Sequence, residues 1–251
     1  MWNNKKVSVV LPTYNEKDSI ERIIRDYFNT GYVDEVVVVN NNAVAGTKEI
    51  VEKTKARQVF EKQQGYGYAI QRGFDEAKGD LIVISEPDGT FQANDIIKLL
   101  AYSDDYDFVW GTRTDIRFIE RGANMGMALR LGNFFVAKIL QFLFNTTRLS
   151  DVGCTLKLYK KEIIDIIKKH FKIGGEHFGV ELMVLSALEG VNIVEVPVRY
   201  EKRVGKSSVT GYFYKTFILA IQMSATILYY FITRGIFQTK KRNRKTQTRE
   251  G

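Results

Sequence analysis

Two carboxylates stand two residues apart at the point where an apolar strand should end. The run Leu81–Ile84 is followed by the sequence Ser-Glu-Pro-Asp-Gly-Thr, which contains Glu86 and Asp88. Side chains at i and i+2 of an extended segment lean the same way, and carboxylate oxygens are ligands that Mg²⁺ and Mn²⁺ prefer. The same residues also suit a plain turn, because proline presets φ and glycine accepts positive φ. This pattern alone therefore leaves a metal site and a turn open.

The elements that would position these carboxylates alternate between strands and helices. Apolar runs predict strands over residues 6–12, 36–39, 58–60, 81–84 and 107–110, and helical periodicity predicts helices over 15–29, 47–54, 67–77 and 94–102. Strands without internal alternation, separated by helices, indicate an α/β fold with a mostly parallel sheet. Ligands bind such sheets beyond the carboxyl ends of the strands, which here are residues 12–16, 40–42 and 86–88.

Composition and charge narrow the class of protein. The chain has 251 residues, of which 45% are hydrophobic, enough for one sizeable α/β domain with appendages. The single Cys154 excludes an intramolecular disulfide and fits a reducing compartment, and no apolar signal segment is visible at the start. Of the net charge of +8, residues 234–251 carry +6 and the other 233 residues only +2. Basic residues concentrated in a tail favour a membrane surface over a nucleic acid as partner.

The segment before this tail is apolar. Residues 216–233 are 18 residues without a formal charge, the lower limit for crossing a bilayer. Lys215, Gln222, Thr226 and Thr233 fall on one narrow helical stripe. We therefore predict a membrane-associated helical segment over residues 211–238, followed by a basic tail over 239–251 that binds the cytoplasmic leaflet. A helix buried in the protein core is the alternative.

Four motifs occur in the order that is typical of one enzyme family. They are residues 9–16 (Val-Val-Leu-Pro-Thr-Tyr-Asn-Glu), 64–69 (Gln-Gly-Tyr-Gly-Tyr-Ala), 86–90 (Glu-Pro-Asp-Gly-Thr) and 111–113 (Gly-Thr-Arg). The chain resembles family 2 glycosyltransferases, and most closely the polyprenyl-phosphate branch that includes dolichyl-phosphate mannose synthases. The resemblance implies a GT-A-like nucleotide-sugar-binding domain over residues 1–210, a divalent Mg²⁺ or Mn²⁺, and an inverting transfer from a GDP- or UDP-sugar.

The resemblance also assigns residues to the donor and the metal. Asp88 and Glu86 match the metal motif, in which Glu86 replaces an aspartate and makes Asp88 the firmer ligand. The second strand departs from the family, because three asparagines stand where paired aspartates are common, which leaves the nucleotide undecided. A helix cap over 12–16 and an ordinary turn at Gly-Tyr-Gly are the structural alternatives. The residues expected at the donor are Pro12, Tyr14, Asn15, Glu16, Asn40, Asn41, Asn42, Gly65, Gly67 and Pro87.

Phosphate binding and catalysis are assigned in the same way. Arg113 and Arg130 match positions that handle phosphate, since a guanidinium meets phosphate oxygens bidentately; a solvated surface is the alternative for both. Asp151 matches the expected general base, with a cap as the alternative.

A basic loop follows further along the chain. Its Gly-Lys-Ser triplet cannot belong to a nucleotide triphosphatase loop, because position 200 would need glycine and is Tyr200. The loop matches Arg-x-Gly-x-Ser instead. Arg203 would stabilise the leaving diphosphate, and Lys206 and Ser207 would assist. His177 and Glu181, four residues apart, could share a helix face, with His177 a weaker metal or phosphate candidate.

These features predict an inverting, metal-dependent glycosyltransferase on the cytoplasmic face of a membrane, with a polyprenyl phosphate as the favoured acceptor. An acceptor that is already a phosphate anion needs little deprotonation, so Asp151 could position groups instead of abstracting a proton. One alternative is transfer to a hydroxyl of a glycan or protein, which requires a true base. Another is a catalytically inactive nucleotide-sugar-binding scaffold at a membrane. A homo-oligomer is left open.

Overall fold

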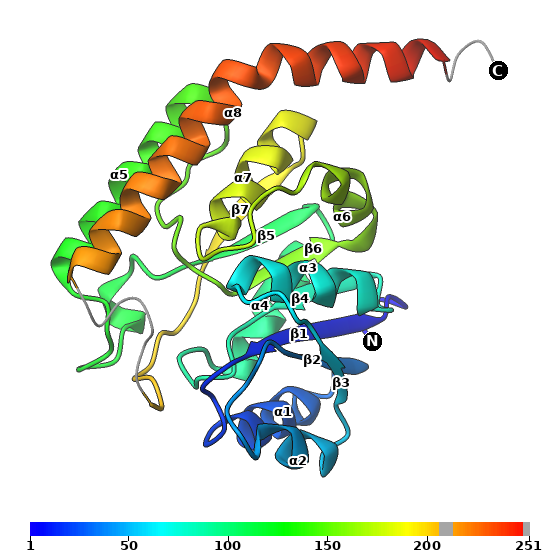
Figure 1. Cartoon of the computed structure of the whole chain (residues 1–251), viewed down its shortest axis with the longest axis vertical. Coiled ribbons are helices and arrows are strands. Elements are labelled where there is room, and N and C mark those ends of the chain that lie inside the picture. Colours follow the sequence, from blue (N-terminus) through cyan, green and yellow to red (C-terminus); the bar gives the residue numbers. More distant parts are fainter. Residues whose placement is uncertain (206–212, 248–251) are drawn as a thin grey trace.

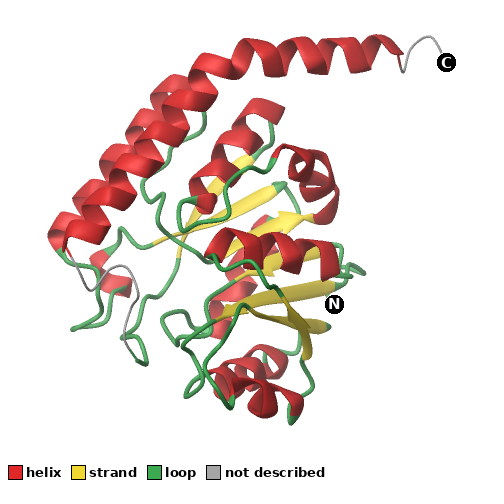
Figure 2. Ribbon diagram, viewed as in Figure 1, coloured by secondary structure: helices red, strands yellow, loops and turns green. Residues whose placement is uncertain are grey.

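The computed structural model describes residues 1–205 and 213–247, with side chains described to residue 205 and over 214–235. These residues form one seven-stranded sheet in the order β3-β2-β1-β4-β6-β5-β7, covered by helices (Figures 1 and 2). The strands are β1 (Val7–Thr13), β2 (Glu35–Asn40), β3 (Arg57–Phe60), β4 (Leu81–Ile84), β5 (Phe108–Thr112), β6 (Lys157–Lys160) and β7 (Ile193–Pro197).

The sheet is mostly parallel, as predicted. β3, β2, β1 and β4 run parallel to one another, and β5 is parallel to the edge strand β7. β1 and β4 are buried along their whole length, which explains why they read as continuous apolar runs. The carboxyl ends of β1, β2 and β4 consequently meet at one edge of the sheet.

The antiparallel strand β6, between β4 and β5, was not predicted. Its Lys157 is buried, with the ammonium 4.3 Å from the centre of the Trp110 ring. Burial lowers the pKa of Lys157 to about 8. A lysine in an interior position hides the apolar pattern by which a buried strand is recognised.

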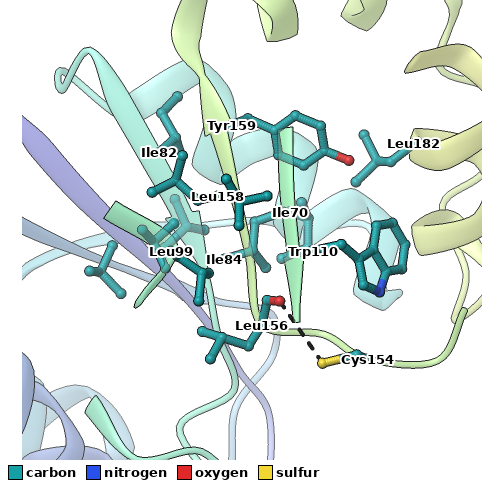
Figure 3. Packing of buried hydrophobic residues seen from close by; sticks show 14 of the residues in the cluster. Ile70, Ile82, Ile84, Leu99, Trp110, Cys154, Leu156, Leu158, Tyr159 and Leu182 are labelled. Atoms are coloured by element: carbon teal, nitrogen blue, oxygen red, sulfur yellow. Dashed lines mark hydrogen bonds between the residues drawn. The ribbon is translucent and has the colours of Figure 1, made fainter. Parts of the chain in front are cut away.

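The core around β4, β5 and β6 is densely packed with large side chains (Figure 3). Tyr159 stacks on Phe108 with ring centres 3.8 Å apart, and Trp110 is fully buried beside them. Cys154 is a buried free thiol at this core, and burial raises its pKa to about 12. The thiol is therefore protonated and contributes apolar packing.

The four helices predicted in the first half of the chain lie close to their predicted positions, with one clear shift. Helix α1 begins at Ile20 instead of residue 15, because the Glu16 carboxylate accepts hydrogen bonds from the backbone N–H groups of Tyr14 and Asn15 and shapes a loop there. The helices are α1 (Ile20–Asn29), α2 (Thr47–Glu52), α3 (Tyr66–Glu76), α4 (Ile96–Tyr102), α5 (Met127–Phe144), α6 (Lys161–Ile167), α7 (Phe178–Glu189) and α8 (Phe213–Gln247), with short 3-10 turns at Ala93–Asp95, Ile116–Phe118 and Lys168–His170.

Two long apolar helices, α5 and α8, lie side by side along one flank of the domain, and the end of α8 projects away from it (Figure 1). By length and composition, both are apolar enough to cross a membrane, over Met127–Phe144 and Tyr214–Gly235. Only α8 was predicted. Its backbone is one helix of 35 residues, so the predicted boundary between an apolar segment and a tail at residue 239 lies inside a continuous helix.

α8 contacts the protein through one face. Met223, Thr226, Ile227 and Tyr230 are buried, with the i, i+3, i+4, i+7 spacing of a helix that packs on a domain. Most of the other side chains described on α8 are exposed or partly exposed, including Phe217, Ile221 and Ile232. The helix therefore has an inner face against the domain and an apolar outer face without a protein partner in the described residues.

Candidate active site

A cavity of about 290 Å³ opens at the carboxyl ends of β1 and β4. Most of the residues expected at the donor or at a phosphate line this cavity. They are Pro12, Tyr14, Asn15, Glu16, Asn41, Gly65, Glu86, Pro87, Arg113 and Arg203. Lys206 and Ser207 lie outside the described residues.

The three asparagines at the end of β2 hydrogen-bond to neighbouring segments instead of facing the cavity as a group. Asn41 donates to the carbonyls of Glu61 and Gln63 at 2.9 and 2.7 Å, and its Oδ1 accepts from the Gly65 N–H at 2.9 Å. Only Asn41 of the three lines the cavity. Asn40 and Asn42 hydrogen-bond within the same loops, to Ala43 and Lys62 among others. The amides of Asn41 and Asn42 thus shape the loop over residues 61–65, and a donor role for the three asparagines stays a prediction.

The glycines of the Gly-Tyr-Gly motif permit a close approach between two segments. A Cβ at Gly65 would lie 2.3 Å from the carbonyl oxygen of Gly174, and one at Gly67 would lie 2.6 Å from that of Ile173. This contact brings residues 173–176 beside the N-terminus of α3, so that Glu176 reaches the cavity. Burial raises the pKa of Glu176. Glu176 was not predicted at the site, because no local pattern in the sequence shows this approach.

Asp88 and Glu86 lie together beneath the cavity with Arg203 between them. Nη2 of Arg203 lies 2.8 Å from Glu86 Oε2 and 2.5 Å from Asp88 Oδ2. Asp88 is fully buried; its Oδ1 accepts from the backbone N–H and the hydroxyl of Thr90, whereas Oδ2 has no hydrogen bond of good geometry among the described residues. Burial, and next the charge of Asp88, raises the pKa of Glu86 well above its ordinary range.

This pair of carboxylates fits a divalent cation. Asp88 Oδ2 is a buried, charged oxygen without a hydrogen bond of good geometry among the described residues, and Nη2 of Arg203, 2.5 Å away, compensates its charge. A divalent cation could compensate the same oxygen. No group of three or more carboxylate, histidine or cysteine side chains suited to a metal occurs in the part of the chain that the structure describes. Two carboxylates suffice for Mg²⁺, which usually completes its shell with water and substrate phosphates. The residues present therefore fit the expected ion.

Asp151 and Arg113 form a buried ion pair behind the cavity. Oδ2 of Asp151 accepts from Nε and the backbone N–H of Arg113 at 2.8 and 3.0 Å, and Oδ1 accepts from Nη2 at 3.0 Å. Burial alone would raise the pKa of Asp151, but the charge and hydrogen bonds of Arg113 outweigh it, and the pKa falls below its ordinary value. A fully buried carboxylate with both oxygens occupied is badly placed to take a proton from an acceptor. The geometry therefore favours a positioning role for Asp151 over the expected general base.

The remaining candidates lie away from the cavity. Arg130, on α5, donates to the carbonyl of Thr114 at 2.9 Å and does not line the cavity. His177 and Glu181 line a second hollow, of about 330 Å³, between α7 and α8. Glu181 is buried and accepts from the Tyr230 hydroxyl at 2.6 Å and from the Ile173 N–H at 3.0 Å. Glu181 thus links α7 to Tyr230 of α8 and to the backbone at Ile173. Burial lowers the pKa of His177.

The family is decided by comparison with known sequences. The sequence pattern of glycosyl transferase family 2 matches residues 8–167, which include β1 to β6 and the carboxylate pair. The chain belongs to this family. It is therefore a glycosyltransferase, as the ordered motifs indicated.

Two curated relatives come from the archaeon Haloferax volcanii. A dolichyl-phosphate hexose transferase is 29% identical over 205 residues, which are 81% of this chain and 86% of that protein. Glycosyltransferase AglJ is 28% identical over 203 residues, which are 78% of this chain and 63% of AglJ. The first of these relatives supports the predicted resemblance to the polyprenyl-phosphate branch of the family.

The fold is shared with a solved enzyme. Glucosyl-3-phosphoglycerate synthase from Mycobacterium tuberculosis, crystallised with Mn²⁺, uridine diphosphate and phosphoglyceric acid, superposes with a TM-score of 0.69 at 18% identity. The match covers 91% of this chain and 79% of that one. The GT-A-like fold class predicted from the sequence is confirmed.

Proposed function

We propose that this family 2 glycosyltransferase moves a sugar, with inversion and with the help of Mg²⁺ or Mn²⁺, from a nucleotide sugar to a polyprenyl phosphate at the cytoplasmic face of a membrane. The donor would enter the cavity from the loops after β1, β2 and β4. The acceptor would enter from the flank formed by α5 and α8. The similarity to a dolichyl-phosphate hexose transferase supports the acceptor class.

The observation that carries this proposal is the composition of the cavity wall. Leu129 and Asn133 of α5 and Leu219 and Met223 of α8 line the same cavity as Glu86 and Arg203. The two helices that supply this wall also carry many exposed apolar side chains, with Phe142 83%, Ile232 79% and Phe135 63% exposed. Surfaces of this kind mark membrane or partner contacts. A lipid chain could thus lie along the helices while its phosphate reaches the carboxylate end of the cavity.

The donor end of the cavity suits a diphosphate held through a metal. Asp88 and Glu86 would hold Mg²⁺ or Mn²⁺, and such an ion would neutralise charge on the leaving diphosphate. The mycobacterial synthase of the same fold has been crystallised with uridine diphosphate and either Mn²⁺ or Mg²⁺, which supports this class of ion. Pro12, Tyr14 and Glu16 would form the nucleoside side of the cavity, where the Glu16 carboxylate fixes the backbone of the loop.

The chain's own residues would act mainly by positioning and by charge. Arg113 lines the cavity and is held in place by the bidentate contact to Asp151, so its guanidinium is preorganised toward a phosphate group. A phosphate acceptor is ionised near neutral pH and needs no general base. The occupied carboxylate of Asp151 is therefore consistent with a phosphate acceptor.

The test uses the full chain in detergent with a radiolabelled nucleotide sugar, Mn²⁺ and a long-chain polyprenyl phosphate. We expect label in the organic extract, and Leu129→Asp and Leu219→Asp should lower this transfer at least tenfold because they place charge on the acceptor wall. Ile166→Asp, at an exposed apolar position on α6, is the matched control and should have no effect. Transfer to a soluble glycan instead would favour a hydroxyl acceptor, and donor binding without any turnover would favour a scaffold.

A further inference from the structure

The cation position between Glu86 and Asp88 is already filled by a side chain of the protein. Nη2 of Arg203 lies within 2.8 Å of Glu86 Oε2 and 2.5 Å of Asp88 Oδ2. These are the two residues whose carboxylates fit a divalent cation. The guanidinium therefore neutralises the carboxylate pair at the place where a metal would have to bind.

The backbone brings Arg203 to this position. The Val204 N–H donates to the carbonyl of Asp88 at 2.8 Å, and the Glu201 N–H donates to the carbonyl of Thr90 at 2.8 Å. Two backbone hydrogen bonds thus attach the loop over residues 201–204 to the turn that carries the carboxylates. The side chain of Arg203 is 22% exposed and also lines the cavity, so it has open space in which to swing away.

We infer that Arg203 and the divalent cation are alternative occupants of one site, and that Arg203 must leave the carboxylates before the metal can bind. This inference rests on the proposed metal-dependent function. Nη2 of Arg203 lies 2.5 Å from the buried Asp88 Oδ2, so a metal bound to this oxygen would stand close to the guanidinium, and like charges at such a distance repel strongly. An arginine released from the carboxylates would point into the cavity, where the donor's diphosphate supplies a new anionic partner.

If Arg203 exchanges with the metal, its side chain weakens metal binding but strengthens binding of the diphosphate. Before the donor binds, the arginine competes with the metal and weakens its binding. After the metal and the donor have bound, the same side chain stabilises the diphosphate. Metal and nucleoside diphosphate should consequently bind cooperatively, since each removes an obstacle to the other.

The test is a pair of binding titrations on the full chain in detergent, with Mn²⁺ alone and then with uridine diphosphate or guanosine diphosphate, whichever binds, at saturating Mn²⁺. A hydrogen-bonded ion pair of this kind should change the Mn²⁺ affinity by about tenfold. Arg203→Ala should therefore bind Mn²⁺ about tenfold more tightly than the wild type and bind the nucleoside diphosphate about tenfold more weakly. Arg203→Lys, which keeps the charge, should lie nearer to the wild type.

Lys202→Ala is the matched control, because it removes a neighbouring positive charge from an exposed side chain of the same loop. It should leave the Mn²⁺ affinity unchanged, and an equal tightening in both variants would mean a general charge effect and overturn the exchange. Unchanged or weaker Mn²⁺ binding by folded Arg203→Ala would also overturn it. Absence of saturable Mn²⁺ binding in the wild type would instead refute the metal site on which the inference rests.

Discussion

Replacement of Asp151 by asparagine should destabilise the fold, and the size of the effect separates a positioning role from a base. Asp151 accepts four hydrogen bonds, three from Arg113 and one from the Gly153 N–H. Asparagine offers one oxygen in place of two and turns its own NH₂ donors toward the donors of Arg113. The buried guanidinium would then lose its charged partner.

Removal of one partner of a buried ion pair typically costs about 3 to 5 kcal/mol. Both side chains are buried, so little of this is screened by solvent. Because asparagine keeps one accepting oxygen, we expect the free energy of unfolding to fall by about 3 kcal/mol, at the lower end of that range. Urea titration of the full chain in detergent near neutral pH, with the slope m compared between variants, measures this change.

The difference in the free energy of unfolding between wild type and Asp151→Asn should depend on pH. Arg113 lowers the pKa of Asp151 below 3.8 in the folded state. A carboxylate with a depressed pKa contributes stability above its unfolded pKa and loses it as the pH falls through the folded value. The gap between wild type and Asp151→Asn should thus be constant near neutral pH and shrink below about pH 4.

Asp115→Asn is the matched control, because Asp115 makes the same kind of bidentate contact with Arg117 on the surface, where Arg117 is 82% exposed. Its unfolding free energy should be essentially unchanged. If Asp151→Asn abolished turnover but left stability as unaffected as Asp115→Asn does, the positioning role would be wrong and Asp151 would be the base.

Three further changes test separate parts of the molecule. Asp88→Asn, which keeps an oxygen to accept from the Thr90 N–H and hydroxyl, should abolish sugar transfer and leave the protein folded, as circular dichroism would show; full activity of the wild type in chelator would contradict this. Tyr230→Phe should lower the free energy of unfolding by about 1.5 to 3 kcal/mol, because its hydroxyl donates to the buried Glu181 carboxylate at 2.6 Å; an unchanged urea midpoint would count against it. Deletion of residues 240–251 should weaken binding to anionic vesicles by about 1 kcal/mol for each basic residue near the surface, in a salt-sensitive way; equal flotation of both proteins would refute the role of the tail.

The features that could be predicted from the sequence are those with local causes. β1, β2 and β4 are buried parallel strands, so their apolar runs identify them without any knowledge of the fold. Glu86 and Asp88 could be placed at the site because they come directly after β4, and ligands bind at the edge of the sheet where such strands end. The family motifs then supplied the class of enzyme.

The features that could not be predicted depend on contacts between distant segments. Asp151 meets Arg113 across 38 positions, and neither residue's neighbours show that the carboxylate is occupied. β6 was missed because Lys157 is buried against Trp110. The apolar character of α5 went unpredicted because Arg130 and Lys138 interrupt it, although its outer face proves as exposed as that of α8.

We propose that the enzyme transfers sugar to a phosphate with the help of a metal and without a general base. Two acceptors that differ only in the phosphate group test this proposal most directly. The measurement is the initial rate of label entering the organic extract with a long-chain polyprenyl phosphate and with the corresponding polyprenol, each with Mn²⁺ and with chelator. We predict lipid-linked sugar from the phosphate with Mn²⁺ and none from the polyprenol. Equal transfer to the polyprenol, or undiminished transfer in chelator, would contradict the proposed chemistry.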